Sequence, residues 1–119
     1  MIRHSDQYRI DLREKMRGGN GTVKIEHLWE PGKEMLSATR MCSRITLAPG
    51  NSIGFHRHDQ EEEVFFILSG TAEADDDGTK GILRAGDTLL TGNGAGHAIR
   101  NAGSDDLVLL AFIGKYPEK

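Results

Sequence analysis

The chain has few of the residues that cross-link, anchor or export a protein. Its 119 residues include one cysteine and three prolines. A single cysteine, Cys42, cannot close a disulfide within the chain, so the fold does not depend on an oxidising compartment. No apolar run approaches the roughly 20 residues of a bilayer span, and the polar start, residues 1–6, does not resemble a secretory signal. We therefore expect a cytoplasmic protein.

An excess of charge of one sign is also missing. Fifteen lysines and arginines stand against 18 aspartates and glutamates, which gives a formal net charge of −3. This balance provides no basic footprint for nucleic acid and no cationic face for a membrane, so we expect neither as a partner. The length fits one compact domain, which we place at residues 1–119.

Glycine, by contrast, is frequent. The 15 glycines separate short apolar runs at fairly even spacing, which is typical of strands joined by tight turns. The strands expected from these runs are 23–29, 40–47, 53–58, 63–68, 71–74, 82–83, 88–90, 97–99 and 107–113. About nine strands and at most one helix predict an all-β sandwich or barrel.

Two segments carry more detailed expectations. Tyr8, Leu12 and Met16 recur every four residues, a pattern that indicates a short helix within residues 1–17. Residues 63–68 are apolar on both faces, which is typical of a central strand covered on both sides.

Several residues of the predicted strands can bind a metal. His56 and His58 are two positions apart, and on a strand such residues point to the same face about 6.6 Å apart, close enough for one ion. Taken alone, they are more simply interpreted as ordinary surface or core histidines. Glu63 opens an apolar strand, where an unpaired buried charge is costly. His97 follows a glycine-rich turn, and the strand expected after it argues against a phosphate loop, which opens a helix.

The spacing of these residues resembles the two motifs of the cupin superfamily. The first motif, within residues 50–70, is matched by Gly50, His56, His58, Glu63 and Gly70. The second, within residues 86–101, is matched by Gly86, Gly92, Gly94, His97 and Asn101. Gly92 is the one departure, because the family usually has proline there. The 15 residues between the motifs are similar to the spacing in short single-domain cupins.

This resemblance implies a cupin double-stranded β-helix, a jelly-roll barrel, with a short N-terminal segment. It also implies that His56, His58, Glu63 and His97 are the metal ligands. Glu61 and Glu62 are rivals of Glu63, but we expect both in a loop. Three imidazoles and one carboxylate suit a divalent transition metal, namely Mn, Fe, Co, Ni or Zn. Four protein ligands leave one or two positions open for water, O₂ or a chelating anion.

Two classes of function fit such a site. The favoured one is a metal-dependent enzyme with dioxygenase-like, decarboxylase-like or isomerase-like chemistry on a small polar or anionic metabolite. The alternative is a non-catalytic module that binds a small molecule, with a structural or ligand-anchoring metal. The two differ in turnover and share every residue named above.

Arg44 is the candidate for binding a substrate carboxylate. Cys42, Arg44 and Thr46 share one face of the strand 40–47, and Arg44 reaches the ligand if that face lines the barrel mouth. An outward-facing arginine in an ion pair is the simpler interpretation. Core packing is the simpler interpretation of Phe65, which shares strand parity with Glu63.

Residues 1–30 form an N-terminal extension that contains a candidate dimerisation strand, Val23 to Trp29. An open strand edge invites pairing with a second chain, and two-fold dimers are the commonest soluble oligomers. The sequence therefore predicts a homodimer with Trp29 at or near the interface.

Overall fold

The structure, a computed structural model, describes residues 1–118 and consists almost entirely of β-strands. Within these residues there is no α-helix, and no helix long and apolar enough to cross a membrane. Two short 3₁₀ turns, η1 (Ser5–Gln7) and η2 (Met16–Gly18), accompany the strands. The strands are β1 (Arg9–Glu14), β2 (Thr22–His27), β3 (Thr39–Leu47), β4 (Ser52–Arg57), β5 (Glu61–Ser69), β6 (Thr71–Asp76), β7 (Thr79–Arg84), β8 (Thr88–Gly92), β9 (Gly96–Asn101) and β10 (Leu107–Lys115).

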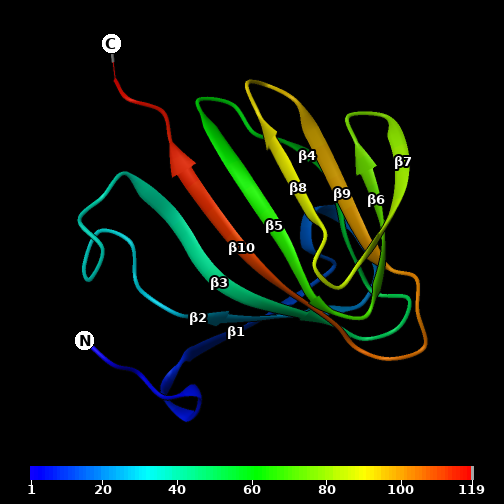
Figure 1. The fold of residues 1–119 in the computed structure, drawn as a ribbon, viewed down its shortest axis with the longest axis horizontal. Coiled ribbons are helices and arrows are strands. Elements are labelled where there is room, and N and C mark those ends of the chain that lie inside the picture. The colour runs from blue at the N-terminus through cyan, green and yellow to red at the C-terminus, as the bar shows by residue number, and fades with distance from the viewer. Residues whose placement is uncertain (119) are drawn as a thin grey trace.

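The strands form two antiparallel sheets (Figure 1). One sheet has six strands in the order β1-β2-β3-β10-β5-β8, and the other has four in the order β4-β9-β6-β7. Neighbours in each sheet are mostly far apart in sequence, as in a jelly roll. The all-β prediction and the jelly-roll architecture are therefore confirmed.

Alternation along the strands fills the space between the sheets. In β3, for example, Ile45 and Leu47 are fully buried, while Arg44 and Thr46, which alternate with them, are partly exposed. Each buried aliphatic side chain of this kind contributes about 2 kcal/mol to folding. The largest apolar side chains that are fully buried are Val23, Ile25, Ile45, Leu47, Phe65, Ile67, Ile99, Leu107 and Leu109.

The expected helix near the N-terminus is wrong. Residues 9–14 form β1, which pairs antiparallel with β2 from Arg9 opposite His27 to Glu14 opposite Thr22. A helix this short is marginal alone, whereas the hairpin gains a full ladder of backbone hydrogen bonds.

The expectation that residues 63–68 are covered on both sides is also wrong. In β5, Phe65 and Ile67 are buried, but Phe66 and Leu68 are 39% and 41% exposed. The strand is central because β10 and β8 flank it, yet only its inner face packs against the second sheet.

β2 is not an open edge. It is hydrogen-bonded to β1 on one side and to β3 on the other, so the edge strand of this sheet is β1. Trp29 lies just beyond β2, partly buried, with the Arg3 guanidinium 4.7 Å from its ring centre. The premise that residues 23–29 offer an unpaired edge is therefore wrong, and the homodimer stays a prediction.

Candidate metal centre

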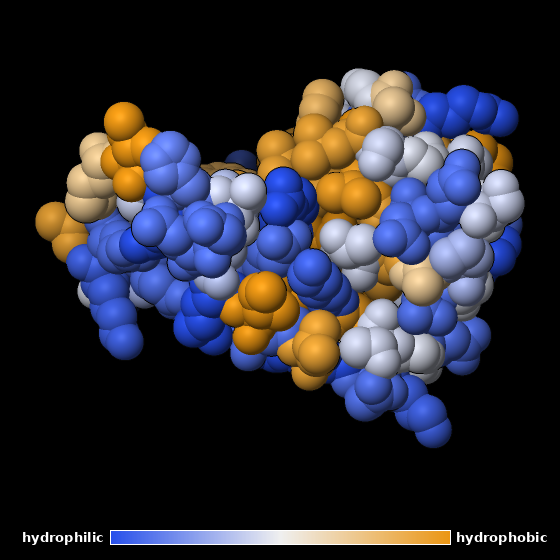
Figure 2. Space-filling view, turned by 90° about the horizontal axis from the view of Figure 1, so that it is seen from below, coloured by the Kyte–Doolittle hydropathy of each residue, from blue (hydrophilic) through white to orange (hydrophobic). Residues whose placement is uncertain are grey.

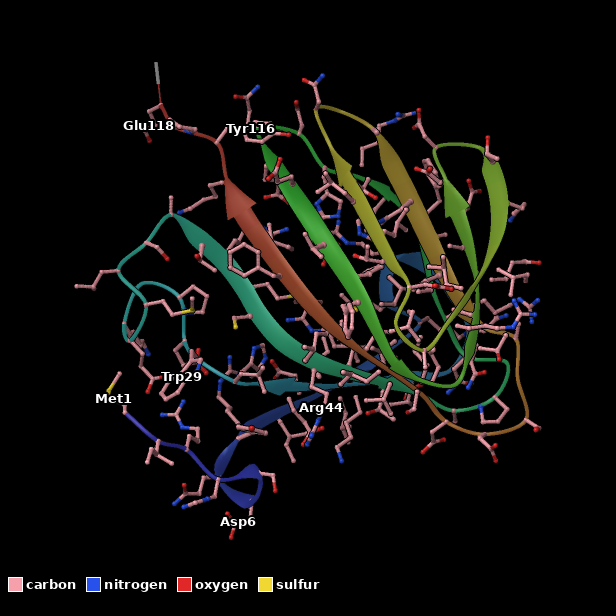
Figure 3. All side chains as sticks on the ribbon, in the orientation of Figure 1. Met1, Asp6, Trp29, Arg44, Tyr116 and Glu118 are labelled. Atoms are coloured by element: carbon pink, nitrogen blue, oxygen red, sulfur yellow. The ribbon has the colours of Figure 1, made fainter. Side chains whose placement is uncertain are left out.

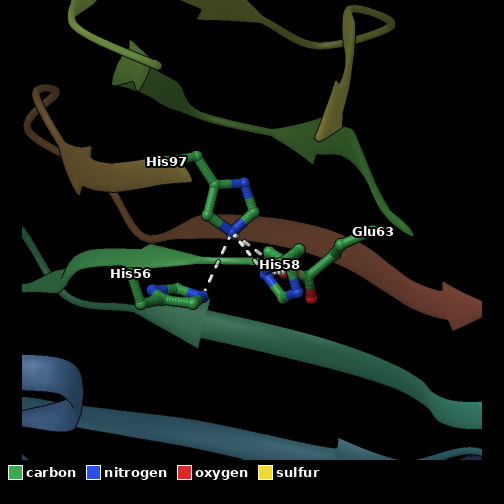
Figure 4. Close-up of side chains that lie close together, drawn as sticks. All are labelled: His56, His58, Glu63 and His97. Atoms are coloured by element: carbon green, nitrogen blue, oxygen red, sulfur yellow. Dashed lines mark hydrogen bonds and ion pairs between the residues drawn. The ribbon is translucent and has the colours of Figure 1, made fainter. Parts of the chain in front are cut away.

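Four side chains from three strands and one loop meet between the two sheets (Figure 4). His56 lies on β4, His58 directly follows β4, Glu63 lies on β5 and His97 lies on β9. One ligand atom from each lies within 4.8 Å of the others, so the group could hold a metal ion. His58, Glu63 and His97 are buried, whereas His56 is partly exposed.

Strand register explains why they meet. β4 pairs antiparallel with β9 so that His56 stands directly opposite His97. In β5, Glu63 shares the inward parity of Phe65, while the preceding residue, Glu62, is exposed. Glu61 and Glu62 belong to β5 rather than to a loop, which corrects the sequence-based expectation.

The spacing of the ligand atoms has the dimensions of a coordination sphere. His97 Nε2 lies 3.1 Å from His58 Nε2 and 3.2 Å from His56 Nε2. Glu63 Oε1 lies 2.9 Å from His58 Nε2 and 3.0 Å from His97 Nε2. Ligands at right angles on an ion with bonds of about 2.1 Å are about 3.0 Å apart.

The outer nitrogen of each histidine has a partner of its own. His56 Nδ1 donates to the Gly54 carbonyl at 2.8 Å, and His58 Nδ1 donates to the Glu61 carboxylate at 2.6 Å. His97 Nδ1 lies 2.9 Å from the Thr91 hydroxyl. A neutral imidazole carries one proton, so a proton held at Nδ1 leaves a lone pair on Nε2. Lone pairs and a carboxylate that converge on one point require a cation, and this donor set fits a divalent metal.

Burial and the neighbouring carboxylate shift the pKa values of these ligands in opposite directions. The hydrogen bond to Glu63 is the main cause that raises the pKa of His58, while burial is the main cause that lowers the pKa of His56. For Glu63, burial raises the pKa of the carboxyl, but the hydrogen bonds and charges of His58 and His97 outweigh it, and the net shift is downward. Protons and metal ions compete for the same histidine nitrogens.

A second layer around the ligands was not predicted from the sequence. Arg40 donates two hydrogen bonds of 2.8 Å to Glu61, and this contact is the main reason why the pKa of Glu61 is about 2. The ionised Glu61 in turn orients His58. The sequence could have indicated Glu61 as the partner of His58, because it follows His58 by three residues. The contact of Thr91 with His97 depends on strand pairing and leaves no local pattern.

Phe65 packs directly on the centre. Its ring stacks on His97 with centroids 4.6 Å apart and planes 10° from parallel. It lines the cavity, whereas Ile67 is fully buried in the core.

A cavity of about 510 Å³ opens over the cluster. Its lining includes three of the four candidate ligands, His56, His58 and Glu63, and apolar side chains such as Phe65 and Ile113. Its cationic lining consists of Arg13, Lys15, Arg17 and Arg40, with Glu14 beside them. The cavity is therefore suited to an anion.

Arg44 does not line this cavity. The alternation of β3 places Ser43 and Ile45 inside, so Arg44 faces outward (Figure 3). There it donates hydrogen bonds of 2.9 and 3.0 Å to the Glu26 carboxylate on the neighbouring strand. The candidate role of Arg44 in binding a substrate carboxylate is contradicted, and the outward ion-paired arginine is the correct alternative.

Asn101 holds a turn, although it belongs to the second motif. Its side-chain amide donates to the carbonyls of Leu47 and Asp105 and accepts from the Gly103 amide. Cys42 is partly buried, and burial raises the pKa of its thiol, as expected for a packing residue rather than a nucleophile.

Comparison with known proteins agrees with this geometry. The family model for the cupin domain matches residues 43–113. An oxalate-binding protein from Thermotoga maritima is 36% identical over 113 residues, which cover 95% of this chain and 93% of that protein. A crystal structure described as a predicted oxalate decarboxylase from Thermotoga maritima has a TM-score of 0.92 and 36% identity, and covers 97% of this chain and 99% of its own. An oxalate decarboxylase from Arthroderma benhamiae is 35% identical over 78% of this chain but only 23% of its own length.

Proposed function

The chain belongs to the cupin family, and on that premise we propose that it binds a small dicarboxylate of the oxalate class on a divalent transition metal. His56, His58, Glu63 and His97 hold the metal. Bound there, the metal supplies a positive charge that accepts carboxylate oxygens. Its identity is one of Mn, Fe, Co, Ni or Zn, which this donor set suits.

One observation carries the proposal. Three imidazoles point Nε2 at the same place as the Glu63 carboxylate, and the outer nitrogens of His56 and His58 hold the protons. The arrangement is supported by partners on all three rings, as is usual for histidines that ligate a metal. Structural histidines in a core have no reason to converge in this way.

The charge of the site favours an anion. A divalent ion and one ionised glutamate leave a net charge of +1, and four protein ligands leave open coordination positions. Phe65 and Ile113 give the cavity apolar lining, and electrostatic attraction is stronger beside apolar side chains than in open water. Oxalate as the probe follows from the names of the two relatives that cover most of this chain.

A calorimetric titration tests the proposal. Metal-free protein is loaded with Mn²⁺, Co²⁺ or Zn²⁺ and titrated with oxalate. We expect binding to at least one loaded form, none to the metal-free protein, and none to a metal-treated His97→Ala variant. Equal binding with and without metal, or no binding to any loaded form, would contradict the proposal.

Decarboxylation is the second candidate. Oxalate and one proton would give formate and CO₂: the carbon–carbon bond breaks and the proton goes to the formate carbon. The carboxyl of Glu14, the one acid lining the cavity besides Glu63 among residues 1–118, favours this candidate as a proton source. Production of formate in many-fold molar excess over the protein, together with loss of this production in Glu14→Gln, would establish an enzyme. Tight binding of oxalate with no formate would establish a binding module.

A further inference from the structure

Three cationic side chains at the cavity come from the end of β1 and the turn that follows it. Arg13, Lys15 and Arg17 are exposed and line the same cavity as the metal centre. Within residues 1–118, none of the three forms an ion pair, whereas Arg40 in the same cavity is paired with Glu61. Glu14 lines the same cavity but, within the described residues, is not ion-paired with them, so their charge is available to a ligand.

The turn that carries Lys15 and Arg17 is fixed against the strand that carries His56. A Cβ atom on Gly19 would lie 2.2 Å from the Ser52 carbonyl oxygen, and one on Gly54 would lie 2.1 Å from the Arg17 carbonyl oxygen. Only glycines allow the two backbones to come so close. Ser52 also accepts a hydrogen bond from the Asn20 amide at 2.8 Å.

Backbone strain accompanies this placement. Lys15 and Arg17 have φ angles of 49° and 55°, in the left-handed region that non-glycine residues seldom adopt. Met16 between them packs against the hydrophobic core. The conformation therefore packs Met16 against the core while both neighbouring cations line the cavity, at the cost of backbone strain at each of them.

We propose that Lys15 and Arg17, assisted by Arg13, bind the second anionic group of a ligand whose first carboxylate lies on the metal. The inference rests on the proposed function and states which ligands the site selects. It binds dianions in preference to monoanions. A cavity of about 510 Å³ leaves room for a ligand that reaches from the metal to the turn. Because the turn precedes residues 43–113, this selectivity comes from outside the part that matches the family model.

The test compares ligands of different charge on the metal-loaded protein. Oxalate, malonate and succinate are titrated beside formate and acetate into wild type and a Lys15→Gln/Arg17→Gln double variant. We expect the double variant to bind its best dicarboxylate about tenfold more weakly, because each partly exposed charge contact is worth a few-fold in affinity. Formate and acetate should change less than twofold, and metal content should not change.

A matched control removes the same charges elsewhere. Lys24 and Arg84 are also exposed, form no ion pair within residues 1–118 and lie outside the cavity. The Lys24→Gln/Arg84→Gln variant should bind every ligand as wild type does. If the turn variant does not fold, Lys15→Gln and Arg17→Gln are measured singly, with about a threefold loss expected for each.

The outcomes separate this inference from the proposed function. Metal-dependent dicarboxylate binding that survives unchanged in the turn variant overturns the inference alone. An equal loss of affinity for formate and for the dicarboxylates also overturns it, because that result indicates a general field rather than a second contact. A metal-loaded wild type that binds no carboxylate overturns both.

Discussion

At the scale of single residues, the histidine partners matter as much as the histidines. Glu61 holds the proton of His58 on Nδ1 and is itself held by Arg40. A carboxylate in this position fixes the tautomer of the ring and raises its basicity toward a metal.

Glu61→Gln should therefore weaken metal binding about tenfold without removing it. Glu62→Gln is the control, because Glu62 is the exposed neighbour in the same strand and should bind metal as wild type does. Competition with a metal-sensitive dye measures both affinities. A larger effect of Glu62→Gln than of Glu61→Gln or Glu63→Gln would mean that the register of β5 is wrong by one residue.

Arg44 acts on stability rather than on the site. Its side chain is 32% exposed and pairs with Glu26, which is 8% exposed. Arg44→Met leaves the Glu26 carboxylate buried without its partner, so we expect a loss of about 2 kcal/mol in unfolding free energy at pH 7. Metal content should not change, and adding Glu26→Gln should recover part of the loss.

The same pair predicts a pH dependence. The hydrogen bond from Arg44 is the main cause that holds the pKa of Glu26 below its ordinary 4.5. A depressed pKa stabilises the folded state above pH 4.5, and this stabilisation is lost as pH falls through the folded-state value. The difference between wild type and Arg44→Met, followed by urea unfolding, should thus be constant near neutrality and shrink in acid. A difference that grows below pH 4.5 would contradict the assignment.

The four candidate ligands could be named because they match the two cupin motifs, and three of them, His56, His58 and Glu63, also leave a local signal. A spacing of two on a strand, and a carboxylate at the start of an apolar strand, can be read from the chain itself. Strand parity also grouped Arg44 correctly with Cys42 and Thr46, but parity does not say which face is inside. Which face points inward depends on the pairing of Arg44 with Glu26 on the neighbouring strand, and the spacing of residues along one strand does not reveal that pairing.

At the scale of elements, the β1–β2 hairpin shows a different limit. The four-residue period of Tyr8, Leu12 and Met16 indicated a helix, but the structure places them before, within and after a strand. Pairing with β2 and the packing of the turn on β4 outweighed the local pattern. Two glycines permit this packing: in the sequence, Gly19 indicated only a break between elements and Gly54 only a position within an expected strand.

Gly19→Ala tests the packing of the turn. The added Cβ would lie 2.2 Å from a backbone oxygen of Ser52, which cannot yield as a flexible side chain can. We expect the turn to move, with a lower Tm and weaker dicarboxylate binding, and with most of the metal content kept. Gly18→Ala is the space control, because nothing lies within 4 Å of its Cβ position, although its positive φ adds some strain. A Gly19→Ala protein as stable as wild type would contradict the close approach.

At the scale of the whole molecule, the outer face of the six-stranded sheet carries exposed apolar side chains. Hydrophobic residues reach the surface in patches beside hydrophilic ones (Figure 2). On β5, β8 and β10, Phe66, Leu90 and Phe112 are 39%, 61% and 42% exposed and lie on neighbouring strands. Such a face is a better candidate for contact with a second copy than β2, whose edges are both paired.

We predict a homodimer that buries this face. Sedimentation equilibrium at micromolar concentration should give about twice the chain mass of 13.1 kDa. Phe66→Glu/Phe112→Glu should give the monomer, because two charges would be buried in the contact. Trp29→Ala is measured in the same way, and it should give the monomer if the interface lies near Trp29, as the sequence predicted. A monomeric wild type would contradict both versions.

The metal content of the purified chain tests the metal centre most directly. Wild type, His58→Ala and Glu63→Gln are loaded with the same divalent ion, dialysed together at pH 7.5 and measured by mass spectrometry of the metal. The convergence of His56, His58, Glu63 and His97 predicts about one ion per chain in wild type and the loss of most of it in both variants. Full retention of the ion by His58→Ala would contradict the metal centre.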